Sequence, residues 1–434
     1  MKEKTLSLKG TNLYDLLSSV EYLREAWKAV KAKKGAPGVD GVTVEDFEKN
    51  ESEELKKLSD ELREWRYEPQ PVRKVEIPKP GGAGKRSLGI PTVRDRIVHQ
   101  SVKMVLEAEF EEGFSQSSFG FRPNRGQREA ISEARGYVES GKEWVVDIDL
   151  EKFFDCINHD RLLYLLRREV KDKAVIKLIA IILKSGILFK GEYEATQKGV
   201  PQGSPLSPLL SNIVLDELDK ELEKRGLSFC RYADDCQIYV GSRKAGNRIM
   251  KSLTRFIERR LKLKVNVTKS CVRKVGKGHF LGFRITPGNL KLSAKTRERL
   301  KSKIRDLTPR RTHVTLSTQI KRINRWLRGW AIYFLPALNR RKLISIEGHI
   351  RRRLRSQIVR NQKRRRYLYN KFIRQGVSVK PAKKAAYNNR GVWKTSQSQA
   401  AHRAWSNAWF RRQGLIEVSQ KYFPITPTYV IAHT

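Results

Sequence analysis

The fold of this chain is decided by the stretch Phe229-Cys-Arg-Tyr-Ala-Asp-Asp-Cys-Gln-Ile-Tyr-Val240. Aromatic and β-branched residues on both sides of Ala233-Asp234 predict two strands joined by a tight turn. Two adjacent carboxylates at the tip of a hairpin repel each other, and a solvated turn is the simplest interpretation of such a pair. A second acidic segment is needed to favour a functional interpretation over a solvated turn.

That second segment is Trp144-Val-Val-Asp-Ile-Asp-Leu-Glu-Lys-Phe-Phe-Asp155, which reads as a buried strand ending in acids. Asp149 precedes Asp234 by 234 − 149 = 85 residues, far enough for the chain to return as a neighbouring strand. Three carboxylates converging at strand ends suit a pair of hard, oxygen-seeking Mg²⁺ ions, which can clamp the attacking and leaving oxygens of a phosphoryl displacement. The pattern predicts the chemistry of a nucleotide polymerase.

Further motifs follow one another along most of the chain. They are Gly35-Ala-Pro-Gly-Val-Asp-Gly41, Ile77-Pro-Lys-Pro-Gly-Gly-Ala-Gly-Lys-Arg-Ser-Leu-Gly-Ile-Pro-Thr92, Ser118-Phe-Gly-Phe-Arg-Pro-Asn124, Gly199-Val-Pro-Gln-Gly-Ser-Pro-Leu-Ser-Pro208, Leu263-Lys-Val-Asn-Val-Thr-Lys269 and Phe280-Leu-Gly-Phe283. With Asp149 and the Tyr-Ala-Asp-Asp hairpin, this ordered set resembles the group II intron-encoded reverse transcriptases, also called maturases. The resemblance is to the bacterial type without a C-terminal endonuclease domain.

The resemblance implies an α+β fold, a right-hand polymerase whose fingers and palm combine an antiparallel sheet with helices. It divides the chain into an N-terminal extension (1–34), fingers and palm (35–290), a helical thumb (291–370) and a small helical maturase/DNA-binding domain (371–434). That last domain is matched more loosely, because Ile358-Val-Arg-Asn-Gln-Lys363 stands where many relatives have Trp-Lys-Gln-Trp-Lys.

Apolar periodicity predicts helices independently of the family. It predicts one helix within residues 11–30, another at Leu209–Leu222, and two long helices carrying apolar stripes over Leu316–Phe334 and Ile346–Ile358.

The resemblance implies that Asp149, Asp234 and Asp235 are catalytic, and that these acids with Leu150 hold two Mg²⁺ ions, or Mn²⁺. Asp235 alternatively supports the fold without touching metal. The nucleotide-binding residues implied are Lys79, Arg86, Leu150, Glu151, Lys152, Phe153, Phe154, Gln202 and Lys269. Backbone amides from Leu150 to Phe153 can cradle phosphates, whereas Lys79 and Lys269 are alternatively plain surface lysines.

Phe154 follows Asp149 at the position where reverse transcriptases place an aromatic ring against the sugar. A ring there leaves no volume for a 2′-hydroxyl, which selects dNTPs over rNTPs. Phe153 is then expected to point into the core.

Composition indicates a polyanionic partner. The chain has 90 Lys+Arg against 46 Asp+Glu, a formal charge of +44 and a pI of about 10.3, and binding should depend strongly on salt. Residues 301–380 hold 24 Lys+Arg and two acids, Asp306 and Glu347. The expected nucleic-acid-binding residues are Arg122, Pro123, Asn124, Gly203, Arg322, Arg325, Arg351, Arg352, Arg353, Arg355, Lys363 and Arg364.

Four cysteines without C-x-x-C spacing, and the lack of a signal peptide or of a long apolar run, indicate a reduced cytoplasmic protein without membrane partners. The expected function is an RNA-dependent DNA polymerase that binds group II intron RNA, assists its splicing and copies it into cDNA, with RNA template, DNA primer, dNTPs and target DNA as partners. Alternatives are a free-standing reverse transcriptase used in DNA repair or defence, a non-catalytic RNA-folding maturase, and an RNA-templated RNA polymerase, which conflicts with Phe154.

Overall fold

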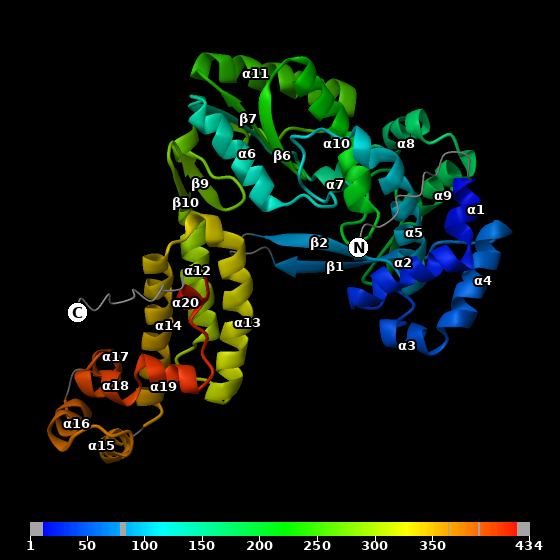
Figure 1. Ribbon diagram of the computed structural model, residues 1–434. Helices are drawn as coiled ribbons and strands as arrows, with labels where there is room; N and C mark the ends of the chain where they lie inside the picture. The colour runs from blue at the N-terminus through cyan, green and yellow to red at the C-terminus, as the bar shows by residue number, and fades with distance from the viewer. Residues whose placement is uncertain (1–11, 79–83, 363, 389–390, 423–434) are drawn as a thin grey trace, which may run out of the picture. The chain divides into compact units, whose positions relative to one another are not determined.

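The chain forms two compact units in this computed structural model, which describes residues 12–78, 84–362, 364–388 and 391–422. Unit 1 comprises Met1–Leu281 and Ile285–Gly288, and unit 2 comprises Gly282–Arg284 and Asn289–Thr434 (Figure 1).

Unit 1 contains two four-stranded sheets. Their strands are β1 (Val72–Pro78), β2 (Lys85–Ile90), β3 (Trp144–Ile148), β4 (Ile187–Phe189), β5 (Glu192–Glu194), β6 (Ser228–Tyr232), β7 (Asp235–Val240) and β8 (Cys271–Lys274). One sheet has the order β6-β7-β3-β8 and is antiparallel throughout. The other has the order β2-β1-β4-β5, with β1 and β4 parallel. The predicted neighbouring strands for the two acidic segments are therefore confirmed.

Helices pack around these sheets in unit 1 (Figure 1). They are α1 (Leu13–Ser18), α2 (Val20–Ala32), α3 (Val44–Lys49), α4 (Glu51–Arg63), α5 (Val93–Phe110), α6 (Gln127–Glu139), α7 (Phe153–Cys156), α8 (His159–Glu169), α9 (Lys173–Leu183), α10 (Ser207–Lys224) and α11 (Arg243–Phe256), with short 3₁₀ or π turns at Glu111–Gly113, Ile257–Leu261 and Val275–Lys277. Helix α10 confirms the prediction for Leu209–Leu222.

Close contact between α11 and the β6-β7-β3-β8 sheet depends on Gly246. A Cβ atom there would lie 2.6 Å from Cγ1 of Val272 on β8. A glycine in the helix interior costs stability, but here it lets the helix lie against the β-branched side chains of the sheet.

The single helix predicted within residues 11–30 is wrong, because the chain breaks at Ser19 into α1 and α2. Ser19 has extended backbone angles, and its hydroxyl accepts a hydrogen bond from the amide of Tyr22 and so caps α2. The apolar pattern continues across the break, since Leu17, Leu23 and Trp27 are all buried in the core of unit 1. Periodicity alone did not reveal a capping serine inside the pattern.

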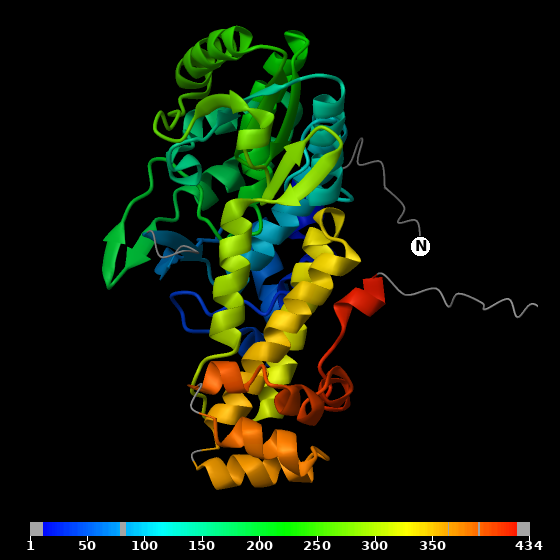
Figure 2. The same cartoon turned by 90° about the vertical axis from the view of Figure 1, so that its left-hand side faces the viewer.

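Unit 2 is almost wholly helical. After β9 (Phe283–Thr286) and β10 (Asn289–Leu292), which pair with each other where the chain passes between the units, come α12 (Ala294–Leu307), α13 (Leu316–Phe334), a 3₁₀ turn (Leu335–Ala337), α14 (Arg340–Arg360), α15 (Arg365–Arg374), α16 (Val379–Ala386), α17 (Gly391–Thr395), α18 (Gln399–Ala404), α19 (Asn407–Arg412) and α20 (Val418–Tyr422). The long helices α12, α13 and α14 run roughly along one another (Figure 2). Helices α13 and α14 confirm the two long helices predicted from apolar stripes.

One core serves the whole of unit 2. It includes Leu327 on α13, Leu354 on α14, Phe372 on α15 and Trp405 just after α18, all with no exposed surface. The division into fingers and palm, thumb and maturase/DNA-binding domain is finer than the two units, and it stays a prediction.

A membrane-spanning segment was not expected from the sequence. Among the residues that the structure describes, no helix is both long and apolar enough to cross a bilayer. The four cysteines are free thiols.

Candidate active site

The acidic hairpin is formed by β6 and β7. Tyr232 pairs with Asp235, which leaves Ala233 and Asp234 as a two-residue turn. Ala233 has φ +57°, in the left-handed region that side chains other than glycine rarely adopt. The turn places Asp234 at the tip of the hairpin.

Asp149 reaches the same end of the sheet from β3. Ile148 pairs with Cys236 on β7, so that Asp149 leaves its strand beside Asp235. Its position is fixed by the backbone, because its amide donates to Oγ of Ser270 at 3.0 Å and its carbonyl accepts from the amide of Asn266 at 2.8 Å. Two acids 85 residues apart thus meet through strand register, 234 − 149 = 85.

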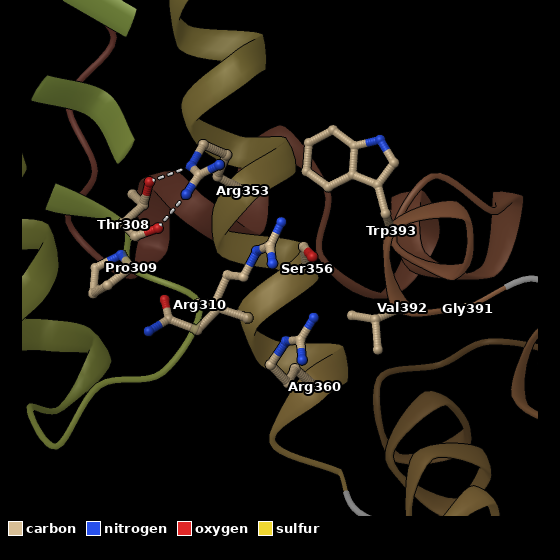
Figure 3. A pocket seen from close by; sticks show the side chains of 10 residues that line it. Thr308, Pro309, Arg310, Arg353, Ser356, Arg360, Gly391, Val392 and Trp393 are labelled. Atoms are coloured by element: carbon tan, nitrogen blue, oxygen red, sulfur yellow. Dashed lines mark hydrogen bonds between the residues drawn. The ribbon is translucent and has the colours of Figure 1, made fainter. Parts of the chain in front are cut away.

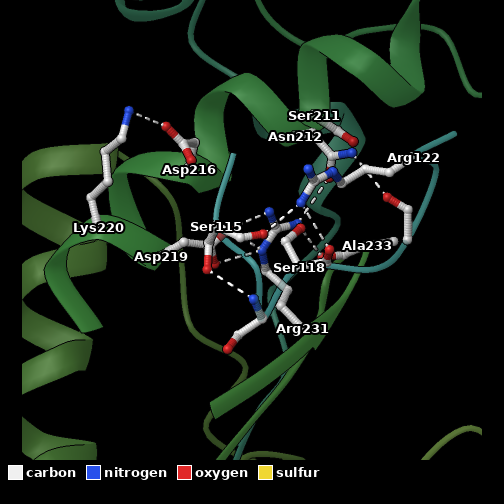
Figure 4. A network of polar contacts seen from close by, with 12 residues as sticks. Ser115, Ser118, Arg122, Ser211, Asn212, Asp216, Asp219, Lys220, Arg231 and Ala233 are labelled. Carbon is white, nitrogen blue, oxygen red and sulfur yellow. Dashed lines mark hydrogen bonds and ion pairs between the residues drawn. The ribbon is translucent and has the colours of Figure 1, made fainter. Parts of the chain in front are cut away.

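A buried arginine holds the turn of the hairpin through hydrogen bonds (Figure 4). Arg231 has no exposed surface, and its Nε donates to both carboxylate oxygens of Asp219, at 2.7 and 2.9 Å. Its Nη1 donates to Oδ1 of Asn212 at 2.9 Å and to the carbonyl of Ala233 at 3.0 Å. The turn that carries Asp234 is therefore bonded directly to the core.

Gly120 lets a second segment lie against this turn. A Cβ atom at Gly120 would be 2.2 Å from the amide nitrogen of Ala233, and the Gly120 carbonyl accepts from Nδ2 of Asn212 at 2.9 Å. The next residue, Phe121, is 48% exposed and lines the large cleft of unit 1. Sequence reasoning did not assign Phe121 to the site, although it lies inside the quoted motif Ser118–Asn124.

This cleft, of 1370 Å³, brings most of the predicted site residues together. Those that line it are Asp149, Leu150, Glu151, Lys152, Phe153, Phe154, Asp234, Arg86, Gln202, Gly203 and Lys269. The volume exceeds the roughly 300–1,000 Å³ of a site for one small molecule. It is large enough to hold a nucleotide next to the end of a nucleic acid strand.

Basic residues not predicted for the site also line this cleft. They are Lys33, Lys74, Lys85, Arg96 and Lys103. Only Lys85, next to Arg86 in the same hairpin, carried a signal that could have been read from the sequence.

Two of the predicted residues are not among the described residues that line the cleft, and some of those that do line it are bonded or buried within the protein. Lys79 lies outside the described residues. Asp235 is half-buried and does not line the cleft. The amide of Glu151 donates to the carbonyl of Lys264 at 2.8 Å, so this member of the expected 150–153 phosphate cradle is engaged within the protein. Phe153 is buried, as predicted, and Phe154 is half-buried.

Burial, and then crowded negative charge, raise the pKa values of two acids in the site. Burial, followed by the nearby Asp147, Asp234 and Asp149, raises the pKa of Asp235 to about 8. Burial and then Asp149 also raise the pKa of Asp234. The cations paired with these acids are Lys269, 3.4 Å from Oδ1 of Asp149, and Arg273, which contacts Asp147.

This crowding fits divalent cations. Carboxylate oxygens are the ligands that hard cations prefer, and each acid here raises the pKa of a neighbour, as expected where positive charge is in deficit. Within the described ranges, no group of three His, Cys, Asp or Glu side chains is close enough to form a complete metal site.

Behind the Gln202 loop lies a polar pair that sequence reasoning missed. Nδ1 of His99 is 2.9 Å from Oγ of Ser204, and both residues are buried. Burial, and then Arg96, lower the pKa of His99 to about 3, so this imidazole is neutral at physiological pH. A single histidine within helix α5 gives no signal in the sequence of this contact with Ser204.

The residues predicted to bind nucleic acid fall into two groups. Exposed ones are Pro123, Asn124, Gly203, Arg322, Arg325, Arg352 and Arg364, and Arg353 is half-buried. Buried ones are Arg122, Arg351 and Arg355. Lys363 lies outside the described residues.

The buried arginines bond to protein groups. Arg122 donates from Nε to Glu111 at 2.9 Å and from Nη1 to the carbonyl of Ser118 at 3.1 Å. Arg355 donates to the carbonyl of Trp405 at 2.9 Å, and Arg351 lies 3.7 Å from Glu347. These contacts favour a role in holding the fold, which charge counting along the sequence could not distinguish from binding.

Comparison with known proteins identifies two family matches. Residues 77–285 match the reverse transcriptase (RNA-dependent DNA polymerase) family, and residues 297–375 match the group II intron, maturase-specific domain. The mixed fold with its acidic antiparallel sheet and helical C-terminal unit confirms the predicted right-hand polymerase class.

Individual relatives agree with these matches. Protein YkfC of Escherichia coli (strain K12) is 35% identical over 320 residues, which cover 64% of this chain and 84% of YkfC. Group II intron-encoded protein LtrA of Lactococcus lactis subsp. cremoris is 35% identical over 221 residues, 51% of this chain and 37% of LtrA. A telomerase structure from Candida albicans is 12% identical over 71% of this chain and 65% of that one, with a TM-score of 0.43, a likeness too weak to bear on function.

Proposed function

This chain belongs to the group II intron reverse transcriptases and maturases, and from that premise we propose that it copies intron RNA into DNA in the cleft of unit 1 and binds and helps to splice that RNA. Copying into cDNA during intron mobility, from a DNA primer and at a DNA target, is part of the proposal. So is a cytoplasmic location, in keeping with four free cysteines.

One observation carries the proposal. Asp149 and Asp234 line a single cleft together with Phe154 and Gln202, although these residues come from three segments that are well separated in the sequence. Acids, an aromatic ring and an amide in one basic-rimmed cleft match the needs of template-directed nucleotidyl transfer.

Asp149, Asp234 and Asp235 would hold the divalent cations, with Leu150 beside them in the cleft wall. Mg²⁺ is the proposed ion because the ligands are carboxylates and because it is commonly bound through one or two carboxylates plus substrate phosphates. When bound, the ions would lower the pKa of the primer 3′-hydroxyl and neutralise charge on the triphosphate and the leaving pyrophosphate.

The other cleft residues would position the nucleotide. Phe154 would lie against the sugar and exclude a 2′-hydroxyl, and Gln202 would lie beside the incoming base pair. Arg86 and Lys269 would offset the phosphate charge. Nζ of Lys269 lies 3.4 Å from Oδ1 of Asp149, so its ammonium group would be within reach of a phosphate bound beside that carboxylate.

RNA binding is proposed for the exposed cations of unit 2. Arg322 and Arg325 on α13, Arg352 on α14 and Arg364 before α15 are exposed, and self-repulsion among so many like charges is relieved by phosphates.

Primer extension on an RNA template with Asp234→Asn tests the catalytic assignment. Asparagine keeps the size of the side chain but removes the charge that holds cations, so cDNA synthesis should fall to background while RNA affinity is unchanged. Asp60→Asn, an exposed acid on α4, is the matched control and should extend primers normally.

The same assay separates the alternatives. Extension by the parent with dNTPs, and with rNTPs only poorly, supports a reverse transcriptase. A parent that promotes splicing of intron RNA but never extends a primer would be a non-catalytic maturase. Full activity of Asp234→Asn would remove this cleft from consideration.

A further inference from the structure

A second hollow, of 500 Å³, lies in unit 2. Its walls come from residues 308–310, which follow α12, from α14 and from the start of α17 (Figure 3). Three arginines line it, Arg310, Arg353 and Arg360, and the described lining contains no carboxylate. We call this the Trp393 hollow, after the aromatic residue on its rim.

A buried amide in this hollow lacks partners. Gln357 is 6% exposed and lines the hollow, and neither its Oε1 nor its Nε2 has a hydrogen-bond partner among the described residues. A buried amide left unbonded is costly, and this one offers one donor group and one acceptor side by side. That pair of groups is complementary to the edge of a nucleobase.

Trp393 supplies an aromatic surface on a fixed backbone. The residue is 42% exposed, and its carbonyl accepts from Oγ of Ser396 at 2.7 Å. Oγ1 of Thr395 donates to the carbonyl of Gly391 at 2.9 Å, which closes the same short helix. Figure 3 shows the indole ring standing across the hollow from Arg353.

The arginines differ in how they are held. Arg353 donates from Nε and Nη2 to the hydroxyl and carbonyl of Thr308, at 2.6 and 2.7 Å, and so forms a fixed wall. Arg310 and Arg360 are exposed, which leaves their guanidinium groups able to reach a phosphate.

We propose that the Trp393 hollow captures one unpaired nucleotide that is extruded from a nucleic acid strand. The base stacks on Trp393, the amide of Gln357 bonds its edge, and Arg310 and Arg360 hold the flanking phosphates. The volume suits one nucleotide and is too small for a duplex. The proposal rests on the proposed function only in taking nucleic acid as the partner, and it adds a site separate from the polymerase cleft.

The test uses the full chain with three hairpin probes. One RNA hairpin carries a single bulged 2-aminopurine, a second RNA hairpin has the same stem fully paired, and a DNA hairpin carries the same bulge. The parent should bind the bulged RNA about tenfold more tightly than the paired one, in line with the effect of stacking a base on an aromatic side chain. Stacking on Trp393 should also quench the 2-aminopurine fluorescence.

Trp393→Ala should remove both effects while leaving affinity for the paired hairpin unchanged. Tyr367→Ala, an aromatic residue of unit 2 that is 55% exposed and outside the hollow, is the control and should behave as the parent. A parent that binds none of the three hairpins would contradict the proposed function itself, whereas equal affinity for bulged and paired hairpins would contradict only the hollow.

Gln357→Leu provides a second test, because a residue with only a structural role would change the melting temperature without changing the preference for the bulged hairpin. Because it replaces a buried, unbonded amide by an apolar group of similar size, it should raise the melting temperature and at the same time reduce the preference for the bulged hairpin. Arg310→Ala with Arg360→Ala should lower the slope of log affinity against log salt by roughly 0.7–0.9 for each phosphate that is no longer neutralised. Lys244→Ala with Lys251→Ala, which removes two exposed cations of α11 in unit 1, is the control and should keep the parent's slope.

The two bulged hairpins show whether the bound nucleotide comes from RNA or from DNA. A response to RNA alone assigns the site to RNA, and an equal response to DNA assigns it to any single-stranded nucleotide. If neither bulge is preferred, or if Trp393→Ala weakens bulged and paired hairpins alike, the hollow is not a nucleotide site.

Discussion

The carboxyl group of Asp235 has a pKa raised above that of an ordinary aspartate. Burial and three neighbouring acids raise its pKa to about 8, against about 3.9 for a free side chain. A divalent cation held by Asp235, as proposed, would require the ionised form of this carboxyl group. The repulsion of crowded charge is therefore largest in the cation-free protein, and it should be visible as a dependence of stability on pH.

The first prediction follows from this raised pKa. Between about pH 4 and pH 8 the folded protein binds more protons at Asp235 than the unfolded chain, so stability should fall as pH rises through that window. Asp235→Asn cannot ionise and should lack this part of the fall. In EDTA, its melting temperature should exceed the parent's by an amount that grows from pH 5 to pH 8, by about 2–4 °C for each kcal/mol.

Two controls accompany that measurement. Asp60→Asn should follow the parent at every pH, because Asp60 lies on an exposed helix surface. Mg²⁺ should raise the melting temperature of the parent more at pH 8 than at pH 6, and should raise that of Asp235→Asn less. A difference between variant and parent that is constant with pH would show that Asp235 does not titrate in this range.

The second prediction concerns sugar selection by Phe154. Phe154→Ala opens volume beside the cleft, so incorporation of rNTPs relative to dNTPs should rise by about tenfold or more in single-nucleotide kinetics. Phe229→Leu is the matched control. Its ring on β6 is 1% exposed and does not line the cleft, so this variant should lose stability without changing selectivity. Unchanged selectivity in Phe154→Ala would mean that another residue excludes the ribose.

At the scale of elements, the β6–β7 hairpin depends on the ion pair of Arg231 and Asp219. Both side chains have no exposed surface, and the arginine also bonds the turn through the Ala233 carbonyl. A buried pair adds little net stability, but removing one partner leaves an uncompensated charge.

The third prediction is that Arg231→Met costs about 3–5 kcal/mol in urea unfolding. Arg231→Met combined with Asp219→Leu should cost clearly less than the single variant, because no charge is then left buried alone. The exposed pair of Arg135 and Glu139 gives the contrast, since Arg135→Met should cost under about 1 kcal/mol. A double variant as unstable as the single one would show that the hydrogen bonds to Asn212 and Ala233, and not the charge pair, hold the hairpin.

Elements of this protein were predictable where the local pattern and the packing agree. Strand β3 and helices α10, α13 and α14 follow from runs of apolar residues that the core does bury. The break at Ser19 was not predictable from periodicity, because Leu17 and Leu23 keep the apolar pattern while a capping hydroxyl interrupts the helix.

At the scale of the whole molecule, the excess of Lys and Arg in the sequence predicts that the protein binds nucleic acid. It does not predict which of these side chains contact the nucleic acid. In the sequence, Arg351 and Arg355 cannot be distinguished from the arginines beside them. In the fold they are buried, with 5% and 3% of their surface exposed. The acids proposed to be catalytic were easier to find, because their meeting depends on strand register, which the apolar pattern specifies. The pocket amide of Gln357 had no signal in the sequence at all.

The last prediction assigns RNA binding to the exposed cations of unit 2. Replacing Arg352, Arg364 and Arg366 with alanine should weaken RNA binding and lower the slope of log affinity against log salt by roughly 0.7–0.9 for each phosphate that is no longer bound. Primer extension at saturating template should change little, since none of the three lines the polymerase cleft. RNA affinity is measured from low to high salt, once with intron RNA and once with an unstructured RNA.

The control removes equal charge elsewhere. Lys244, Lys251 and Arg255 are exposed on α11 in unit 1, and their triple alanine variant should keep the parent's slope if binding is local to unit 2. Arg351→Ala should behave differently from both, because it breaks a buried ion pair with Glu347 and Glu417; it should lower the melting temperature and leave the slope of the folded protein unchanged. Equal slopes for the two triple variants would show that net charge alone attracts the RNA, and the specific surface would then have to lie on residues other than these exposed arginines.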